Sequence, residues 1–241
     1  MNKLIDNRNA IRGILNRDFE YYTNEHNHIF YVVQVLLRKK DGCEKDNYPV
    51  YQKIIDTPEK IDKIFNDAVY YAEKYNGRVY LTVSPKIKEK VSLRLAKAFI
   101  DYSDNCDKSP EAILYSTATM SGNSCCPRII FDFDGVDRDK NGIGTCINNF
   151  FSSLQQKYGI DYFSLPTING FHVIADLIID YTSDEVIDLM TDEFKQLIKD
   201  VYYFNNDVNT PKHFKTMLKD MLHKESGNIL VYFKKIIKHY E

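Results

Sequence analysis

Apolar residues in the first hundred positions form short blocks with two kinds of spacing. Alternating or continuous apolar runs predict strands, whereas apolar positions that recur every three or four residues predict helices. The pairs Thr57-Pro58 and Asn76-Gly77 are residue types that begin and end helices. The predicted order is a strand over 28–40, a strand over 48–56, a helix from 57 to about 75, a strand over 78–83 and a helix from 84 to 100. We expect these elements to form an N-terminal αβ lobe over residues 1–104.

The second half of the chain follows an irregular stretch. Residues 101–127 begin with the acidic side chains Asp101, Asp104, Asp107 and Glu111 and continue with small residues and the Cys125-Cys126 pair, so a connecting segment is predicted over 105–127. A C-terminal lobe over 128–241 is predicted after it. Its expected strands are 128–134, 162–165, 171–179 and 228–233, and its expected helices are 150–158 and 183–201. The sequence therefore predicts an α+β fold.

The composition is that of an ordinary globular protein. The chain has 241 residues and a mass of 28.2 kDa, with 44% hydrophobic and 27% charged residues, which excludes collagen-like and wholly disordered chains. The net charge of -2 means that an anionic partner must be held by a local patch. Five cysteines, an odd number, indicate free thiols in a reducing compartment. We find no signal peptide and no membrane span, and expect a cytoplasmic protein.

Two carboxylates end the apolar segment Ile129–Gly135. Because strand side chains alternate between faces, Asp132 and Asp134 should share one face while Phe131 and Phe133 cover the other. Neighbouring carboxylates repel each other and lose hydration, so a cation would stabilise them, and oxygen ligands suit Mg²⁺ or Mn²⁺. The alternative is a strand that simply emerges into water at Asp132.

A histidine and two basic runs are further candidates for binding anions. His172 follows a glycine-containing turn and opens an apolar strand, where an imidazole can meet an anion or serve as a hydrogen-bonded core residue. Residues 78–97 hold six basic and one acidic side chain, and residues 211–241 hold seven and three. Both runs can follow a phosphate backbone, or form solvated helix faces and a tail.

The order and spacing of these motifs match a pattern found in a known protein superfamily. Ile129–Asp134, followed about forty residues later by Thr167–His172, resembles the first two motifs of the archaeo-eukaryotic primase superfamily. Lys74–Leu81 and Leu222–Tyr232 are similar to segments of its phage and mobile-element branch, so the resemblance covers about residues 50–233. It implies a two-lobed primase-polymerase core, with an RRM-like sheet and helices in the C-terminal lobe.

The resemblance also implies an activity and a set of site residues. In that superfamily three acids hold two divalent metals, and the histidine contacts the phosphates of the incoming nucleotide. The implied catalytic residues are Asp132, Asp134 and His172, the implied metal ligands are Asp132, Asp134 and Asp220, and the implied nucleotide contacts are His172, Asn169, Lys224 and His223. Asp207 and Glu225 compete with Asp220, because the matched position of the third acid holds Met221.

The implied function is that of a DNA primase or primase-polymerase catalytic subunit. It would perform template-directed nucleotidyl transfer on single-stranded DNA, with nucleoside triphosphates and two Mg²⁺ or Mn²⁺ ions, in the host cytoplasm if the gene is phage-borne. A helicase, where one is needed, would be a separate chain.

Two other functions fit parts of the pattern. Asp132-Phe133-Asp134-Gly135 also resembles the first motif of haloacid-dehalogenase-type phosphatases, which normally ends the first strand of a doubly wound domain. A primase-like scaffold that lacks the third acid would instead only bind nucleic acid. The run Asp137–Gly142 mimics a calcium loop, but Asn148 stands where a bidentate Glu is required, which excludes that site.

Overall fold

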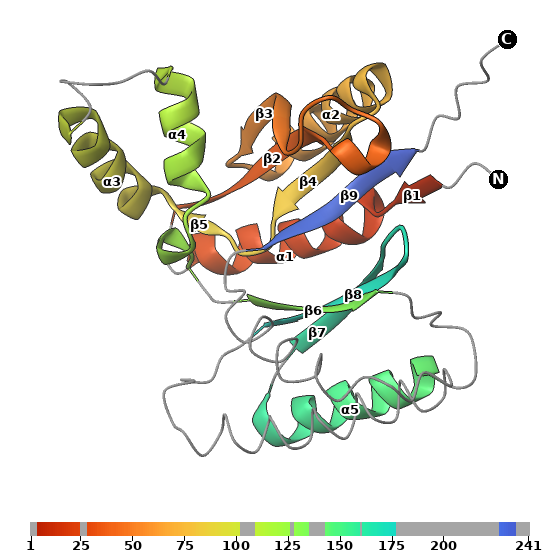
Figure 1. The fold of residues 1–241 in the computed structure, drawn as a ribbon. Helices are drawn as coiled ribbons and strands as arrows, with labels where there is room; N and C mark the ends of the chain where they lie inside the picture. Colours follow the sequence, from red (N-terminus) through yellow and green to blue (C-terminus); the bar gives the residue numbers. More distant parts are fainter. Residues whose placement is uncertain are drawn as a thin grey trace, which may run out of the picture. The chain divides into compact units, whose positions relative to one another are not determined.

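The chain folds into two compact units of mixed α+β structure, which confirms the predicted fold class (Figure 1). The computed structural model describes residues 4–24, 28–101, 109–125, 128–134, 143–159, 161–176 and 227–234. Unit 1 comprises Met1–Cys125 and Ser226–Glu241, and unit 2 comprises Cys126–Glu225. All pairings between the described strands are antiparallel.

Unit 1 is built on an antiparallel sheet with the strand order β1-β9-β4-β2-β3, and β5 pairs with β2 beside this path. Its strands are β1 (Leu4–Asp6), β2 (Ile29–Leu37), β3 (Tyr48–Ile55), β4 (Arg78–Thr82), β5 (Lys86–Ile87) and β9 (Asn228–Lys234). The strands predicted over 28–40, 48–56 and 78–83 are confirmed. Strands β2 and β4 are largely buried inside the sheet, whereas β3 is the last strand of the order and Ile55 is its one buried residue.

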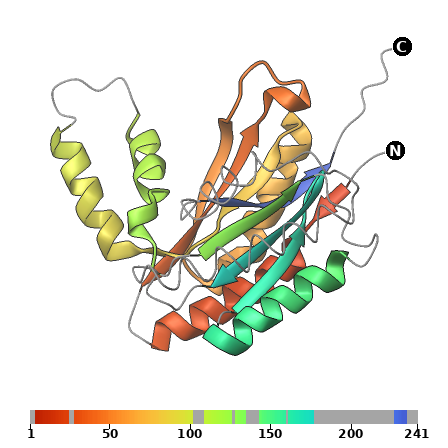
Figure 2. The same cartoon turned by 60° about the horizontal axis from the view of Figure 1, so that its bottom comes forward.

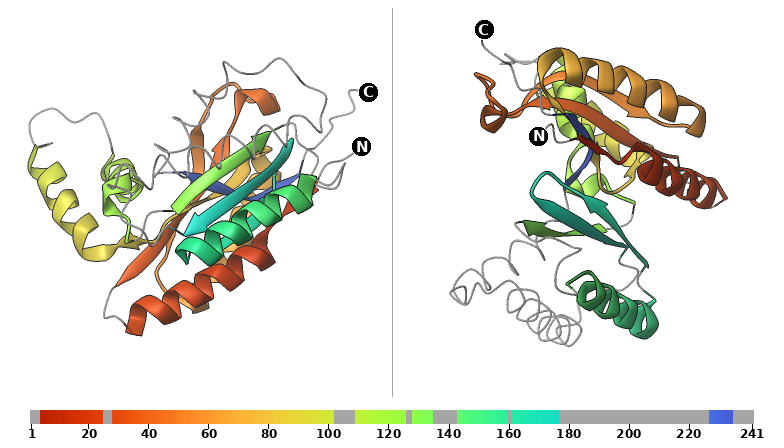
Figure 3. Two further views of the ribbon diagram at one scale, coloured as in Figure 1. Left: turned by 90° about the horizontal axis from the view of Figure 1, so that it is seen from below. Right: turned by 90° about the vertical axis from the view of Figure 1, so that its right-hand side faces the viewer.

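Two helices lie side by side on one face of this sheet (Figure 3). They are α1 (Arg8–Asn24) and α2 (Ile61–Tyr75), and an ion pair between Arg12 and Asp62 joins them. Ile11 and Leu15 of α1 are fully buried, as is Phe65 of α2. The apolar stripe of each helix therefore supplies one side of the core of unit 1.

The end of α2 follows the sequence prediction. Asn76 adopts a left-handed conformation (φ 54°), and the N–H of Gly77 donates to the carbonyl of Ala72 at 2.8 Å. A Cβ on Gly77 would lie only 2.8 Å from Cγ1 of Val35, so glycine permits the close approach of β4 to β2. At the other end Thr57 is extended and precedes a 3-10 turn over Pro58–Lys60, without a side-chain capping bond.

A pair of helices packs against the other face of the sheet near its β5 end (Figure 2). These are α3 (Lys88–Asp101) and α4 (Pro110–Ala118), which share a small core with β2. Its buried members are Phe30, Val32, Val91, Tyr115 and Ala118. The hydroxyl of Tyr115 donates to the carbonyl of Gln52 at 2.8 Å and so ties α4 to β3.

Two boundaries in this region differ from the sequence predictions. The helix predicted from residue 84 begins at Lys88, because Lys86 and Ile87 first pair with Phe30 and Ile29 as strand β5. The segment predicted as a connection contains α4, whose first turn is capped by Ser109, with Oγ accepting from the N–H of Ala112 at 3.2 Å.

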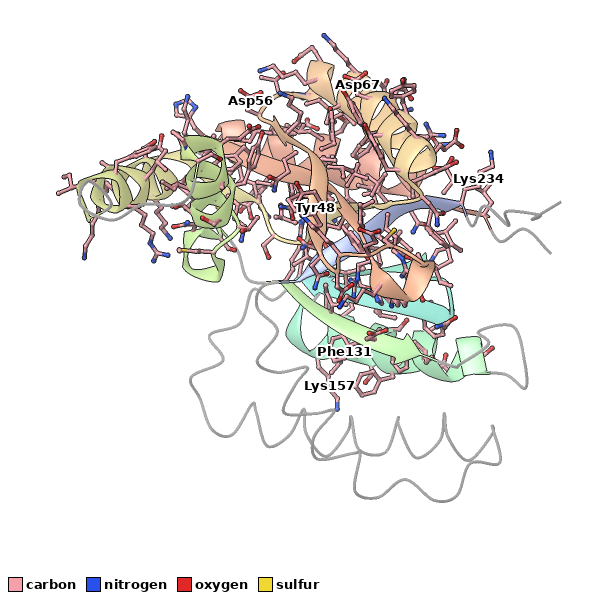
Figure 4. All side chains as sticks on the ribbon, turned by 45° about the horizontal axis from the view of Figure 1, so that its top comes forward. Tyr48, Asp56, Asp67, Phe131, Lys157 and Lys234 are labelled. Carbon is pink, nitrogen blue, oxygen red and sulfur yellow. The ribbon has the colours of Figure 1, made fainter. Side chains whose placement is uncertain are left out.

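Unit 2 contains a three-stranded sheet and one described helix. The strand order is β6-β8-β7, with bounds β6 (Arg128–Asp134), β7 (Asp161–Pro166) and β8 (Gly170–Asp176), and the helix is α5 (Ile143–Tyr158). Figure 4 labels Phe131 on the side of β6 that α5 covers. Its ring packs edge-on against that of Phe151, with 5.0 Å between the ring centroids, and Phe151 also packs on Tyr162. This aromatic layer fixes the inner face of the sheet.

The last strand belongs to a different unit from the one predicted. Residues 228–233 do form a strand, but β9 pairs with β1 and β4 of unit 1 and not with the strands of a lobe over 128–241. The reason is non-local: Ile229, Val231 and Phe233 are buried in unit 1, next to strands from the beginning of the chain. The helix predicted over 183–201 lies outside the described residues.

Candidate active site

Asp132 and His172 are brought together on adjacent strands of unit 2. They are direct partners in the β6–β8 register, and Nε2 of His172 lies 3.3 Å from Oδ1 of Asp132. Both occupy the face of the sheet opposite Phe131, which is buried under α5. The side chains are 34% and 17% exposed for Asp132 and His172, so the pair is largely shielded from bulk solvent. Shielding strengthens the interaction between a carboxylate and an imidazole.

The second ring nitrogen of His172, Nδ1, does not take part in the contact with Asp132. Nδ1 is buried and forms no hydrogen bond with any residue in the part of the chain that the structure describes. An unsatisfied buried imidazole nitrogen costs about 1–3 kcal/mol, so a further partner at this atom would be favourable. With Nε2 in contact with Asp132, Nδ1 is the ring nitrogen of His172 that forms no hydrogen bond within the described residues.

The position of Asp134 is the last residue of β6, at the end of the sheet where β7 turns into β8. It is two residues beyond Asp132 on β6, on the same face by the alternation of the strand, and its register partner is Gly170. The turn from β7 to β8 closes beside it, with the N–H of Thr167 donating to the carbonyl of Gly170 at 2.8 Å. Asn169 is exposed in this turn. The positions of Asp134 and Asn169 therefore fall at the same end of the sheet.

An ion pair that the sequence analysis did not identify lies at the other end of the same face. Arg128 is buried and forms an ion pair with Asp176, its register partner on β8. Between the two polar pairs lie Ile130 and Ile174, which are also register partners. Opposite charges at the first residue of one strand and the last of another are a signal for such pairing, but only once the register is known.

The remaining predicted site residues have no counterpart in the described structure. Asp220, His223 and Lys224, together with the competing acids Asp207 and Glu225, lie outside the described residues. Within the described residues, no group of three or more His, Cys, Asp or Glu side chains is placed to hold a metal ion. The third acid therefore stays a prediction.

The donor chemistry of the described residues fits a hard divalent cation in part. The Asp132 carboxylate is partly exposed, and the Asp134 position follows it on the same face. Carboxylate oxygens are ligands that Mg²⁺ and Mn²⁺ accept, and such sites complete their coordination with water and substrate phosphates. Asp132 and Asp134 are the two residues of β6 that would hold a metal.

The basic run over 78–97 is only partly a surface feature. Arg78 is buried and donates to both carboxylate oxygens of Asp41 at 2.6 Å, and Lys86 is buried as well. The prediction that the whole run could follow a phosphate backbone is therefore wrong for these two residues. Lys88, Lys90, Arg94 and Lys97 are exposed on α3. Of the basic side chains in the second run, 211–241, only Lys234 lies within the described residues.

No protein-family model, no curated protein and no solved structure matches this chain. Among the helices that the structure describes, none combines the length and the apolar character needed to cross a membrane.

Proposed function

We propose that this protein is a metal-dependent nucleotidyltransferase of the DNA primase or primase-polymerase type. The observation that carries the proposal is the Asp132–His172 pair, with 3.3 Å between Oδ1 and Nε2 on directly paired residues of β6 and β8. The proposal includes a two-lobed primase-like fold, in which the β6-β8-β7 sheet is the RRM-like element. Its substrates would be nucleoside triphosphates and a single-stranded DNA template.

Each residue of the pair has a defined task in this proposal. Asp132 and Asp134 would hold divalent cations, which when bound neutralise triphosphate charge and stabilise the attacking and leaving oxygens of an in-line displacement. His172 orients the Asp132 carboxylate through Nε2 and offers Nδ1 to a phosphate oxygen. Because strand positions are rigid, these groups would be arranged before the substrate binds.

The phosphatase alternative is less well supported. It requires the first Asp at the end of a strand in a doubly wound parallel sheet, whereas β6 pairs antiparallel with β8. The scaffold alternative, in which the protein binds nucleic acid without catalysis, is separated from the proposal by experiment.

The test is nucleotide incorporation on a primed and an unprimed single-stranded template with labelled nucleotides and Mn²⁺. We expect products from the natural protein and a loss of at least about 100-fold in Asp132→Asn and Asp134→Asn, because metal ligands are removed. His172→Gln should raise the KM for nucleotide more than it lowers kcat. Asp161→Asn is the matched control, since Asp161 is an exposed acid on β7 that accepts from Gln155 at 2.9 Å.

Other outcomes would reject the proposal. Hydrolysis of a generic phosphate ester that depends on Asp132, without incorporation, would support the phosphatase. Template binding with no incorporation under Mg²⁺ or Mn²⁺ would support the scaffold.

A further inference from the structure

Lys86 is a buried cation in unit 1 whose partners are all neutral. The residue is only 2% exposed, and its Nζ donates to Oγ of Ser124 at 2.9 Å and to the carbonyl of Met120 at 3.2 Å. No carboxylate of the described residues forms an ion pair with it. Burial lowers the pKa of Lys86 to about 8, so most of the side chains still carry a proton at pH 7. A buried charge without a counter-charge is unfavourable, and an anion nearby would offset that cost.

The local backbone explains why Lys86 and Ser124 meet. The two residues form an isolated antiparallel bridge, and the N–H of Cys125 donates to the carbonyl of Pro85 at 2.9 Å. Direct partners in such a bridge direct their side chains to the same side. These contacts hold the segment Met120–Ser124 against the side chain of Lys86.

A second cation approaches the same segment from α3. An added Cβ on Gly122 would lie 2.7 Å from Nη2 of Arg94 and 3.1 Å from Nη1, so the guanidinium lies directly against this glycine. Both Arg94 and Gly122 are exposed, which makes this side of the segment accessible to a ligand. The segment is therefore flanked by one buried and one exposed cation.

Ser124 connects the buried cation to the surface. Because its Oγ accepts a hydrogen bond from Lys86, its own hydroxyl proton is left to donate. A hydroxyl that accepts from a cation is a stronger donor, and Ser124 is partly exposed. The segment is also held rigidly, since Asn123 is fully buried and its Nδ2 donates to the carbonyl of Thr117 at 2.7 Å.

We propose that the segment Met120–Ser124, with Lys86 and Arg94, binds a phosphate group. Arg94 and the Ser124 hydroxyl are the direct donors, and Lys86 supplies positive charge beneath them. The assignment of this phosphate to a polynucleotide or to a nucleoside triphosphate rests on the proposed function. The observation that Lys86 is buried without a described counter-charge does not depend on that function.

The test follows the titration of Lys86 by NMR in the full chain carrying ¹³C-labelled lysine, with the signal assigned from Lys86→Met. The probes are inorganic phosphate, a nucleoside triphosphate and an oligothymidylate. A bound anion favours the protonated lysine, so we expect the midpoint of Lys86 to rise by about one pH unit at saturation. Arg94→Gln should weaken probe binding about ten-fold, whereas Lys97→Gln, the same change of charge on the same helix, should weaken it less than two-fold.

The outcomes distinguish the two possible sources of the phosphate. A response to oligothymidylate at lower concentration than to triphosphate assigns the site to the strand, and the reverse order assigns it to the nucleotide. An unchanged Lys86 midpoint with all three probes overturns the site, as does equal weakening by Arg94→Gln and Lys97→Gln. If the protein incorporates nucleotides but shows either of these two results, the phosphate site is rejected and the proposed function stands. If Lys86 responds to the probes but the protein incorporates no nucleotides, only the proposed function is rejected.

Discussion

Asp132 and His172 are register partners in the β6–β8 ladder, and their side chains meet with 3.3 Å between Oδ1 and Nε2. The contact depends on the register, because a slip of one residue would turn one side chain to the face covered by α5. The aromatic contact of Phe131 with Phe151 holds β6 against such a slip. The fold of unit 2 therefore fixes a carboxylate and an imidazole in one place on one face.

A divalent cation should stabilise the protein through Asp132. We expect 1 mM Mn²⁺ to raise the Tm by a few degrees, because a ligand that binds only the folded state stabilises it. Asp132→Asn should abolish this rise, and Asp161→Asn should preserve it. The measurement is differential scanning calorimetry with and without Mn²⁺. An equal rise in Asp132→Asn would show that the cation binds elsewhere.

Replacing Lys86 should make the protein more stable and reveal the cost of its burial. The folded-state pKa of about 8 lies below the ordinary value of 10.5, so the unfolded chain binds more protons between these values and stability rises with pH there. Below pH 8 the full cost is present. At pH 7 we expect Lys86→Met to gain about 1–3 kcal/mol of unfolding free energy, since an unpaired buried charge is removed and two hydrogen bonds are lost.

This gain should fade above pH 8 and be nearly absent at pH 10.5, because Lys86 is then neutral in the folded state and only about half protonated in the unfolded chain, where its pKa is the ordinary 10.5. Urea denaturation at pH 7 and pH 10.5 provides the comparison. The exposed Lys97→Met is the control and should change stability by less than about 0.5 kcal/mol. A gain that is the same at both pH values would mean that Lys86 pays no electrostatic penalty.

The strands of this protein were predictable because their signals are local. The segments that became β2, β3, β4 and β6 are dense in β-branched and aromatic residues, and their turn residues end them at the expected places. Helix α1 (Arg8–Asn24) was not predicted, although its buried residues Ile11, Leu15 and Phe19 recur every four residues, which is the spacing of a helix. These three side chains form the stripe by which α1 packs on the sheet.

Other features could not be predicted because they join distant parts of the chain. The pairing of β9 with β1 and β4 depends on strands from the beginning of the chain and has no signature in the β9 segment itself. At the candidate site, alternation along β6 correctly placed Phe131 and Phe133 in the core, but only the register places His172 opposite Asp132. The Lys86–Ser124 bridge was hidden for the same reason, since it joins segments on either side of α3 and α4.

Strand β9 should be secured to α2 through Glu73. Its Oε1 accepts from the Tyr232 hydroxyl at 2.6 Å and from Nζ of Lys234 at 3.2 Å, which joins β9 to α2. The hydrogen bond from Tyr232 lowers the pKa of Glu73, followed by that from Lys234. Because the folded-state pKa is depressed, the stabilisation is present above the ordinary value of 4.5 and is lost as the pH falls below it.

Glu73→Gln should therefore lower the unfolding free energy by about 0.5–1 kcal/mol at pH 7, the range of a partly exposed pair. The difference from the natural protein should shrink as the pH falls from 4.5 toward 3. Glu44→Gln, an exposed change in the turn between β2 and β3, should have no measurable effect. A deficit for Glu73→Gln that persists at pH 3 would assign its effect to packing and not to charge.

The buried pair of Arg78 and Asp41 should be a major determinant of stability and not part of a nucleic-acid surface. The two side chains are each 8% exposed, and the guanidinium donates two hydrogen bonds of 2.6 Å. Asp41→Asn leaves a buried cation without its counter-charge and should cost about 3 kcal/mol of unfolding free energy. Asp46→Asn is the control, since Asp46 pairs with Arg38 at 3.0 Å at the surface and its replacement should cost much less than that of Asp41.

The double variant Asp41→Asn with Arg78→Met should recover much of the loss, because it removes the stranded charge as well. Chemical denaturation of the four proteins in the cycle gives the coupling energy directly. If Asp41→Asn costs no more than Asp46→Asn, the pair is not buried as described. Binding of an oligothymidylate at constant salt should be unchanged in the folded Asp41→Asn protein, because a guanidinium covered by the Phe233 ring at 4.8 Å does not reach a phosphate backbone.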